Sequence, residues 1–88
     1  MAWVVYMIEC LDGSIYTGMS SDVERRWNEH NDVMGSKYTG SHRPVRLLWT
    51  ETHNDKESAE RREMQIKRWT HRKKLALASG DLALLKRL

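Results

Sequence analysis

The chain has 88 residues, of which 40% are hydrophobic and 31% charged, with one Pro and a formal net charge of +3. These values exclude two domains within this length and a disordered or fibrous chain, and they predict a single folded domain over residues 1–88. The longest apolar run, residues 2–8, is too short to span a membrane, and the lone Cys10 cannot form an intrachain disulfide, so we expect a cytoplasmic protein without a membrane anchor.

A strand hairpin is predicted at the start of the chain. Residues 3–10 are rich in Val, Ile and Tyr and apolar on both alternating faces, which is typical of a central strand, and the strand returns to about residue 19. A two-residue turn would place Tyr6 and Tyr16 on opposite faces of the sheet. A three-residue turn with Gly13 in the left-handed region would place both on one face, with Gly18 opposite Tyr6 leaving room for a ligand. We predict the three-residue form.

The next segments alternate between helix, loop and strand. Ser21 and Glu24 have the spacing of a capping box, which predicts a helix to about residue 31. Residues 35–44 contain several turn formers and are expected to be a polar loop. Residues 45–52 combine β-branched and aromatic residues without a breaker, which predicts a third strand.

Helices are predicted for the rest of the chain. Asp55 is a plausible N-cap for a helix that runs to about residue 70, and residues 71–78 either continue it or turn a corner. Gly80 interrupts the helical pattern, and Asp81 caps a last short helix. The order β-β-α-β-α-α predicts an α+β fold, a small three-stranded antiparallel sheet flanked by helices.

Polar residues interrupt the apolar faces of both predicted helices. Arg26 and His30 are i, i+4 neighbours beside an apolar stripe, whereas Arg25 points about 100° away. In the later helix Glu63 lies on the same face as the apolar residues. Each has an ordinary structural explanation, namely a long side chain reaching to solvent, a half-buried His or an ion pair, and a chemical one, since a carboxylate suits a divalent cation.

The positive charge is concentrated between residues 61 and 74. This stretch contains seven basic residues against one acidic residue, and Trp69 and His71 are interleaved with them. A charge run on a helix is commonly only a solvated face. Basic side chains interleaved with aromatic ones favour a polyanionic partner, with nucleic acid as the leading candidate.

In this order, the hairpin tyrosines with Gly18, then Arg26 and His30, then Glu63 resemble the GIY-YIG nuclease superfamily. The two strand tripeptides that give the superfamily its name correspond to Val4-Val5-Tyr6 and Tyr16-Thr17-Gly18, and the similarity extends over nearly the whole chain. The segments at residues 35–39, 43–45 and 63–69 are similar to its small stand-alone bacterial members. Val4 and Thr17 replace the first Gly and the second Ile of the tripeptides. Many members carry an Asn after the position of Glu63 and a basic residue near the second tripeptide. In this chain no Asn follows Asn54, and no basic residue flanks the second tripeptide.

This resemblance implies a divalent-metal-dependent nuclease that selects the structure of DNA rather than its sequence and acts in DNA repair or processing. Tyr6 would be the general base, assisted by His30 and by the positive charge of Arg26. Arg26 and Tyr16 would bind the scissile phosphate, and Glu63 would hold one Mg²⁺ or Mn²⁺. Together these are the expected catalytic residues, Tyr6, Tyr16, Arg26, His30 and Glu63, with Gly18 allowing close backbone approach. The residues expected to position nucleic acid are Lys37, Tyr38, Arg43, Lys67, Arg68, Arg72 and Lys73.

Two alternatives belong to other functional classes. A non-catalytic nucleic-acid-binding domain would keep the fold without cleavage, and the missing Asn and flanking basic residue favour it. A subunit that cleaves only with a larger protein partner is suggested by the short chain and its leucine-rich C-terminus. The expected nucleic acid is DNA, with RNA as the alternative.

Overall fold

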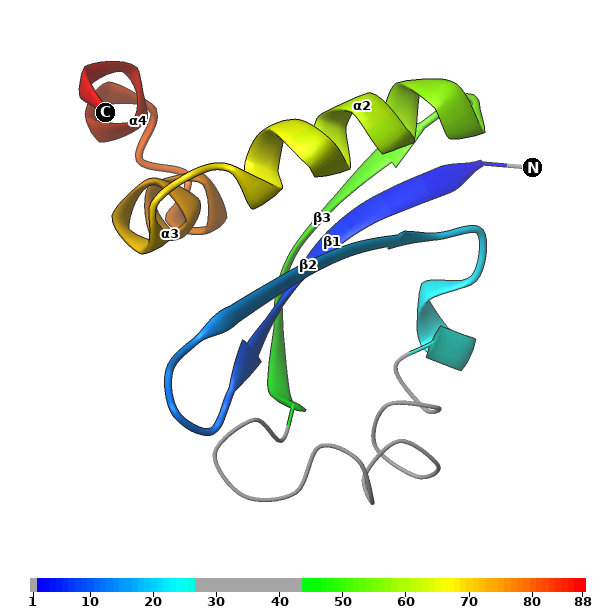
Figure 1. Ribbon diagram of the computed structural model, residues 1–88, viewed down its shortest axis with the longest axis horizontal. Coiled ribbons are helices and arrows are strands. Elements are labelled where there is room, and N and C mark those ends of the chain that lie inside the picture. The colour runs from blue at the N-terminus through cyan, green and yellow to red at the C-terminus, as the bar shows by residue number, and fades with distance from the viewer. Residues whose placement is uncertain (1, 27–43) are drawn as a thin grey trace.

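A computed structural model of the protein describes residues 2–26 and 44–88 (Figure 1). Its strands and helices are β1 (Trp3–Cys10), β2 (Ile15–Ser20), β3 (Pro44–His53), α2 (Lys56–Lys67), α3 (His71–Ser79) and α4 (Leu82–Arg87). The strands form one antiparallel sheet in the order β2-β1-β3. Figure 1 shows α2, α3 and α4 on one side of this sheet and a helical turn at residues 23–26 on the other. The predicted α+β class and element order are confirmed.

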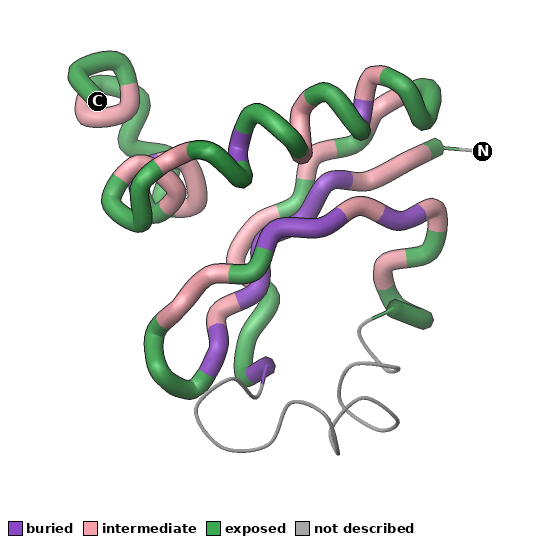
Figure 2. Tube along the Cα trace, viewed as in Figure 1, coloured by how far each residue is buried: buried purple, intermediate pink, exposed green. Residues whose placement is uncertain are grey.

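The central strand β1 is buried on both faces (Figure 2). Because side chains alternate along a strand, Val5 and Met7 share one face, where they form the main core with Ala59 and Ile66 of α2. Tyr6 points to the opposite face and is only 1% exposed. The two faces of β1 therefore have different roles, one as the core beneath α2 and the other as a buried polar position.

The hairpin between β1 and β2 has the predicted three-residue turn. Tyr6 pairs with Gly18 in the antiparallel register. The Cys10 N–H donates to the Ser14 carbonyl at 2.8 Å, and the Gly13 N–H donates to the Cys10 carbonyl at 2.9 Å. Gly13 has a φ of 86°, which a glycine adopts without steric strain. The register therefore places Tyr6 and Tyr16 on one face of the sheet, as the three-residue turn predicts.

The helical turn at residues 23–26 begins one residue later than its capping box predicts. Asp22 Oδ1 accepts from the Arg25 N–H at 3.1 Å, and the Asp22 carbonyl accepts from the Arg26 N–H at 3.1 Å. The Ser20 hydroxyl in turn accepts from the Asp22 N–H at 2.9 Å. Asp22, and not Ser21, is therefore the N-cap. Both residue types cap well. The hydrogen bond from Asp22 to Ser20, the last residue of β2, holds Asp22 in the capping position.

Side-chain caps define the helices that follow β3. Asp55 caps α2 as predicted, but α2 ends before residue 70, and the Thr70 side chain caps a separate helix, α3. The chain thus turns a corner between α2 and α3. Gly80, with a φ of 76°, ends α3, and Asp81 caps α4. Across residues 2–26 and 44–88 we find no helix with the length and apolar character that crossing a membrane requires.

Thr17 has a buried hydroxyl whose oxygen accepts and donates no hydrogen bond within the described part of the chain. Its side chain lies on the α2 face and is 3% exposed. Because an unsatisfied buried hydroxyl is unfavourable, we expect Thr17→Val to raise the free energy of unfolding by about 1 kcal/mol. Urea unfolding measures the change, with Thr52→Val at an exposed position of β3 as the control. A loss of stability at position 17 would show that the hydroxyl has a partner.

Candidate active site

Two tyrosines of the hairpin form the centre of the candidate site. Ile8 of β1 pairs with Tyr16 of β2, so Tyr6 and Tyr16 are diagonal neighbours on one face of the sheet, as predicted. Their ring centroids are 6.4 Å apart and their planes are inclined by 41°. Tyr6 is buried, whereas Tyr16 is 37% exposed. One phenol is therefore shielded from water while its neighbour is accessible from solution.

Gly18 accommodates the Tyr6 ring. A Cβ atom at Gly18 would lie 2.6 Å from Tyr6 Oη, 2.7 Å from Tyr6 Cζ and 3.0 Å from Tyr16 Cε1. The space that the sequence suggests for a ligand beside Tyr6 is thus filled by the phenol itself. Gly18 contributes to the site by letting the Tyr6 ring lie across the backbone of β2.

We expect Gly18→Ala to displace the Tyr6 phenol and to lower the free energy of unfolding by about 1 to 3 kcal/mol, as overpacking of a tight site does. Urea unfolding measures the loss. In the Tyr6→Phe background the same substitution should be less destabilising, because the nearest atom to the new methyl group is the Tyr6 hydroxyl oxygen. Equal destabilisation in both backgrounds would contradict this contact.

Arg26 and Glu63 both act on the buried phenol of Tyr6. Burial raises the pKa of Tyr6 above its ordinary value, and the neighbouring Tyr16 raises it further. A hydrogen bond from the Arg26 side chain and the positive charge of Arg26 lower this pKa, and the negative charge of Glu63 raises it. The net shift is upward. Arg26 therefore reaches the tyrosine face of the sheet, in agreement with its predicted helix phase.

The raised pKa of Tyr6 predicts a pH dependence of stability. Between the ordinary tyrosine pKa of about 10 and the higher pKa in the folded protein, the unfolded chain has lost the phenol proton while the folded chain keeps it. The contribution of Tyr6 is therefore complete below about pH 10 and is lost as the pH rises further. In urea unfolding, the wild type should lose stability relative to Tyr6→Phe as the pH rises above about 10. A gain of the wild type relative to Tyr6→Phe there would contradict the upward shift.

Glu63 lies on α2 between the two buried residues of that helix, Ala59 and Ile66, as the helix phase predicts. Its side chain is 15% exposed, and Glu63 Oε1 lies 3.2 Å from Lys67 Nζ. The ion pair considered as the structural explanation of this residue is therefore present. From the α2 side of the sheet, the carboxylate charge still acts on Tyr6.

Glu63 is a single candidate ligand for a hard divalent cation. Within residues 2–26 and 44–88, no three His, Cys, Asp or Glu side chains cluster closely enough to hold a metal ion. Mg²⁺ commonly keeps several waters and is bound in proteins by one or two carboxylates together with substrate phosphates. A single half-buried carboxylate such as Glu63 fits this kind of site.

Basic and aromatic side chains meet at the corner between α2 and α3. Trp69 is half-buried there, with the Arg62 guanidinium carbon 5.4 Å and Lys73 Nζ 4.5 Å from its ring centroid. Both distances are in the range of cation–π interactions. The predicted nucleic-acid-binding residues Lys67, Arg68 and Arg72 lie exposed on the same corner, and Lys73 is half-buried. The remaining predicted site residues, His30, Lys37, Tyr38 and Arg43, lie outside the described residues.

A polar network that the sequence did not predict joins β3 to α2. His53 contacts Glu51 Oε1 through Nε2 at 2.8 Å and the Ser58 hydroxyl through Nδ1 at 2.7 Å. Arg62 Nε donates to the same Glu51 oxygen at 3.1 Å. The network thus connects the sheet to the helix that carries Glu63. No spacing rule could have found it, because its residues come together only when β3 and α2 are in contact.

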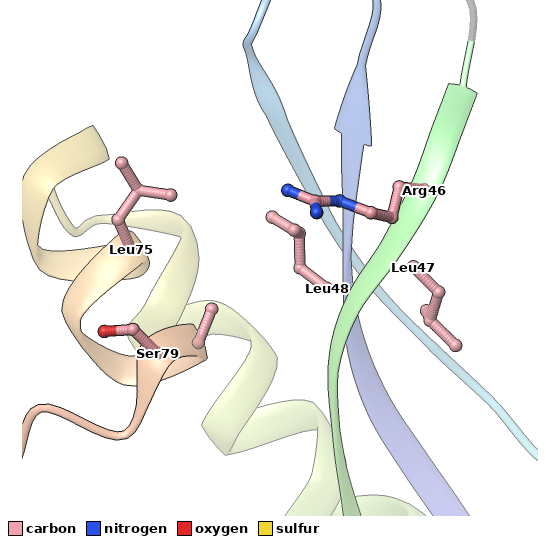
Figure 3. A pocket seen from close by; sticks show the side chains of 6 residues that line it. Arg46, Leu47, Leu48, Leu75 and Ser79 are labelled. Carbon is pink, nitrogen blue, oxygen red and sulfur yellow. The ribbon is translucent and has the colours of Figure 1, made fainter.

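A pocket lies between β3 and α3, away from the tyrosine pair. Its volume is about 310 Å³, and it is lined by Arg46, Leu47, Leu48, Leu75, Ala78 and Ser79. Figure 3 shows Arg46 and Leu48 extending from β3 toward Leu75 and Ser79 of α3. None of the predicted catalytic residues lines this pocket. The tyrosine pair therefore lies apart from this cavity.

Comparison with known proteins gives matches over most of the chain. The GIY-YIG catalytic domain family matches residues 2–76. A UPF0213 protein of Staphylococcus saprophyticus is 44% identical over 75 residues, covering 85% of this chain and 92% of the relative. A UPF0213 protein of Desulfotalea psychrophila is 43% identical over 81 residues, covering 91% and 74%.

A solved structure also matches. The solution NMR structure of a UPF0213 protein from Bacillus halodurans is 44% identical and superimposes with a TM-score of 0.58. The match covers 90% of this chain and 84% of that protein. The similarity therefore extends from the sequence to the arrangement of the helices and strands.

Proposed function

Because this chain belongs to the GIY-YIG catalytic domain family and to the UPF0213 family of small bacterial proteins, we propose that it is a nuclease that hydrolyses phosphodiester bonds of DNA. One observation carries the proposal: a buried Tyr6 beside Tyr16 that is hydrogen-bonded by Arg26 and within electrostatic reach of Glu63. These four residues come from four separate segments of the chain. They are also the residues that the sequence resemblance assigns to the site.

Tyr6 is proposed as the general base that takes the proton of the attacking water. A buried phenol with a raised pKa holds its own proton at neutral pH, so it needs nearby positive charge to lose it. Arg26 supplies part of that charge through its hydrogen bond to Tyr6. His30 is proposed to assist in moving the proton away.

Arg26 and Tyr16 are proposed to bind the scissile phosphate. A guanidinium can hold two phosphate oxygens at once and stabilise the negative charge that develops on them in the transition state. Tyr16 is exposed on the same face, so a phosphate can approach it from solution, and its hydroxyl is proposed to orient a phosphate oxygen. Arg26 thus acts on both the base and the phosphate.

Glu63 is proposed to hold one Mg²⁺ or Mn²⁺. When bound, this ion would polarise the phosphate and lower the pKa of a water molecule. The carboxylate contributes the negative charge that retains the ion, and this charge is within electrostatic reach of Tyr6. Its partly buried position on α2 restricts the number of conformations from which it can do so.

The corner between α2 and α3 is proposed to position the nucleic-acid backbone. This corner carries Lys67, Arg68, Arg72 and Lys73. The same nucleic-acid strand is proposed to contact Lys37, Tyr38 and Arg43. Contacts between cations and phosphates are independent of base sequence, so selectivity for DNA structure is expected. Such selectivity is consistent with a role in DNA repair or processing.

A cleavage panel tests this function. Labelled linear, flapped, branched and single-stranded DNA, and a matched RNA, are incubated with purified protein with and without Mg²⁺ or Mn²⁺. Metal-dependent cleavage of at least one structured DNA is the expected result. Binding without cleavage of any substrate would instead support the non-catalytic domain, and cleavage only after adding a cell fraction would support the partner-dependent subunit.

A further inference from the structure

We propose that Lys67 is a counter-ion of Glu63 that has to leave the carboxylate before a divalent metal ion binds there. A nucleic-acid phosphate, by pairing with Lys67, promotes this exchange. This inference rests on the proposed metal-binding role of Glu63. It adds a positioning role for Lys67, through which binding of the nucleic acid and binding of the metal ion would assist each other.

The geometry puts Lys67 and a metal ion in competition for the same oxygen atoms. Lys67 Nζ lies 3.2 Å from Glu63 Oε1, and the two residues are i, i+4 neighbours on α2. The Glu63 side chain is only 15% exposed, whereas that of Lys67 is 51% exposed. Direct coordination of Mg²⁺ or Mn²⁺ needs carboxylate oxygens at short distance. An ammonium group at hydrogen-bonding distance on the limited accessible surface of Glu63 therefore opposes that coordination.

Lys67 is suited to move, whereas its basic neighbours Arg62 and Lys73 are held. Arg62 is bound to Glu51 and stacked on Trp69, and Lys73 also lies over the Trp69 ring. Lys67 is half exposed at the end of a long flexible stem, so it can exchange one anionic partner for another at little cost in packing. Of these three cations, Lys67 is therefore the one placed to leave its carboxylate.

The surroundings of Lys67 favour an incoming phosphate. Lys74 lies near enough that the positive charge of Lys67, together with the larger effect of burial, lowers the pKa of the Lys74 ammonium. Two neighbouring ammonium groups repel each other, and an anion between them relieves the repulsion. When Lys67 turns to a phosphate, Glu63 loses its counter-ion and becomes available to a metal ion. Binding of each ligand then strengthens binding of the other, by the same factor in both directions.

Metal binding without nucleic acid is the first test. Electron paramagnetic resonance of free Mn²⁺ measures its affinity for the wild type, Lys67→Gln and the matched control Lys56→Gln on the same helix, with Lys67→Ala as a second variant. We expect both Lys67 variants to bind Mn²⁺ about two- to fivefold more tightly, the factor for loss of a partly exposed ion pair. Lys56→Gln should stay close to the wild type. An unchanged affinity in both Lys67 variants, or an equal gain in Lys56→Gln, overturns the inference.

Adding Glu63→Gln to Lys67→Gln separates this inference from the proposed function. The double variant should lose the gain in Mn²⁺ affinity. If it binds as tightly as Lys67→Gln, Glu63 is not the metal ligand, and both the proposed metal site and this inference fail. If Glu63→Gln weakens Mn²⁺ binding while the Lys67 variants bind no more tightly than the wild type, only the role of Lys67 fails.

Coupling to nucleic acid is measured in the Tyr6→Phe background, which prevents cleavage in the proposed mechanism. Fluorescence anisotropy gives the affinity for a short labelled DNA duplex with and without Mn²⁺ at constant ionic strength. With Lys67 present, Mn²⁺ should tighten duplex binding, and Lys67→Gln should reduce that factor toward one. An equal factor in both proteins would overturn the phosphate-driven release of Lys67.

Discussion

Glu63→Gln is expected to abolish metal-dependent cleavage while DNA binding is kept or slightly strengthened. The proposed metal ion loses its anionic ligand, and loss of several kcal/mol of transition-state stabilisation corresponds to about a thousandfold or more in rate. The phosphate loses a repulsive neighbour, and Lys67 loses the carboxylate at 3.2 Å and is free to contact DNA. Single-turnover cleavage at saturating Mg²⁺ and anisotropy with labelled DNA measure the two effects separately.

Glu60→Gln is the matched control for this change. Glu60 lies on the same helix, is exposed, and its substitution alters the net charge by the same amount. It should leave cleavage within about twofold of the wild type, because an exposed charge away from the reacting groups is strongly screened. Near wild-type cleavage by Glu63→Gln would assign Glu63 to a purely structural ion pair with Lys67. Equal losses in both variants would point to a general charge effect.

Arg26→Ala is expected to lower the single-turnover rate at least a hundredfold, about 3 kcal/mol or more of transition-state stabilisation. Arg26 hydrogen-bonds Tyr6 and lowers its pKa, so the substitution removes help to the proposed base as well as a phosphate ligand. Arg26→Lys should recover only part of the loss, because a lysine ammonium does not reproduce the planar two-point contact of a guanidinium. Cleavage rates of the two variants measure these effects.

Arg25→Ala is the control for position 26, since it removes the same charge from the adjacent residue. Helix phase turns Arg25 about 100° away from Arg26, so a loss of at most a few-fold is expected. Comparable losses at both positions would mean that bulk charge, and not the contact with Tyr6, carries the effect. An unaltered rate in Arg26→Ala would refute the catalytic assignment of Arg26.

Much of the fold could be predicted because its signals are local. Gly13 and the apolar residues on both faces of β1 indicate a hairpin within a few residues, and Asp55, Gly80 and Asp81 mark helix ends by their own side chains or backbone freedom. Local signals were insufficient where two residues could do the same task. Ser21 and Asp22 can both cap a helix, and Asp22 does so here, where its N–H is bonded to Ser20 at the end of β2.

For the candidate site, helix phase and strand alternation predicted which residues face one another, and not what they contact. The sequence alone determined that Arg26 and Arg25 point in different directions and that Glu63 lies on the buried side of α2, because a period of 3.6 residues follows from backbone geometry. It left two hairpin turns open, and the register of the sheet decided that Tyr6 and Tyr16 share a face. Only the tertiary structure decided that the Tyr6 ring fills the space over Gly18, that Arg26 hydrogen-bonds Tyr6 and that Lys67 occupies the Glu63 carboxylate. Those contacts depend on side-chain conformation and on the distance between separately folded segments, neither of which residue spacing along the chain can specify.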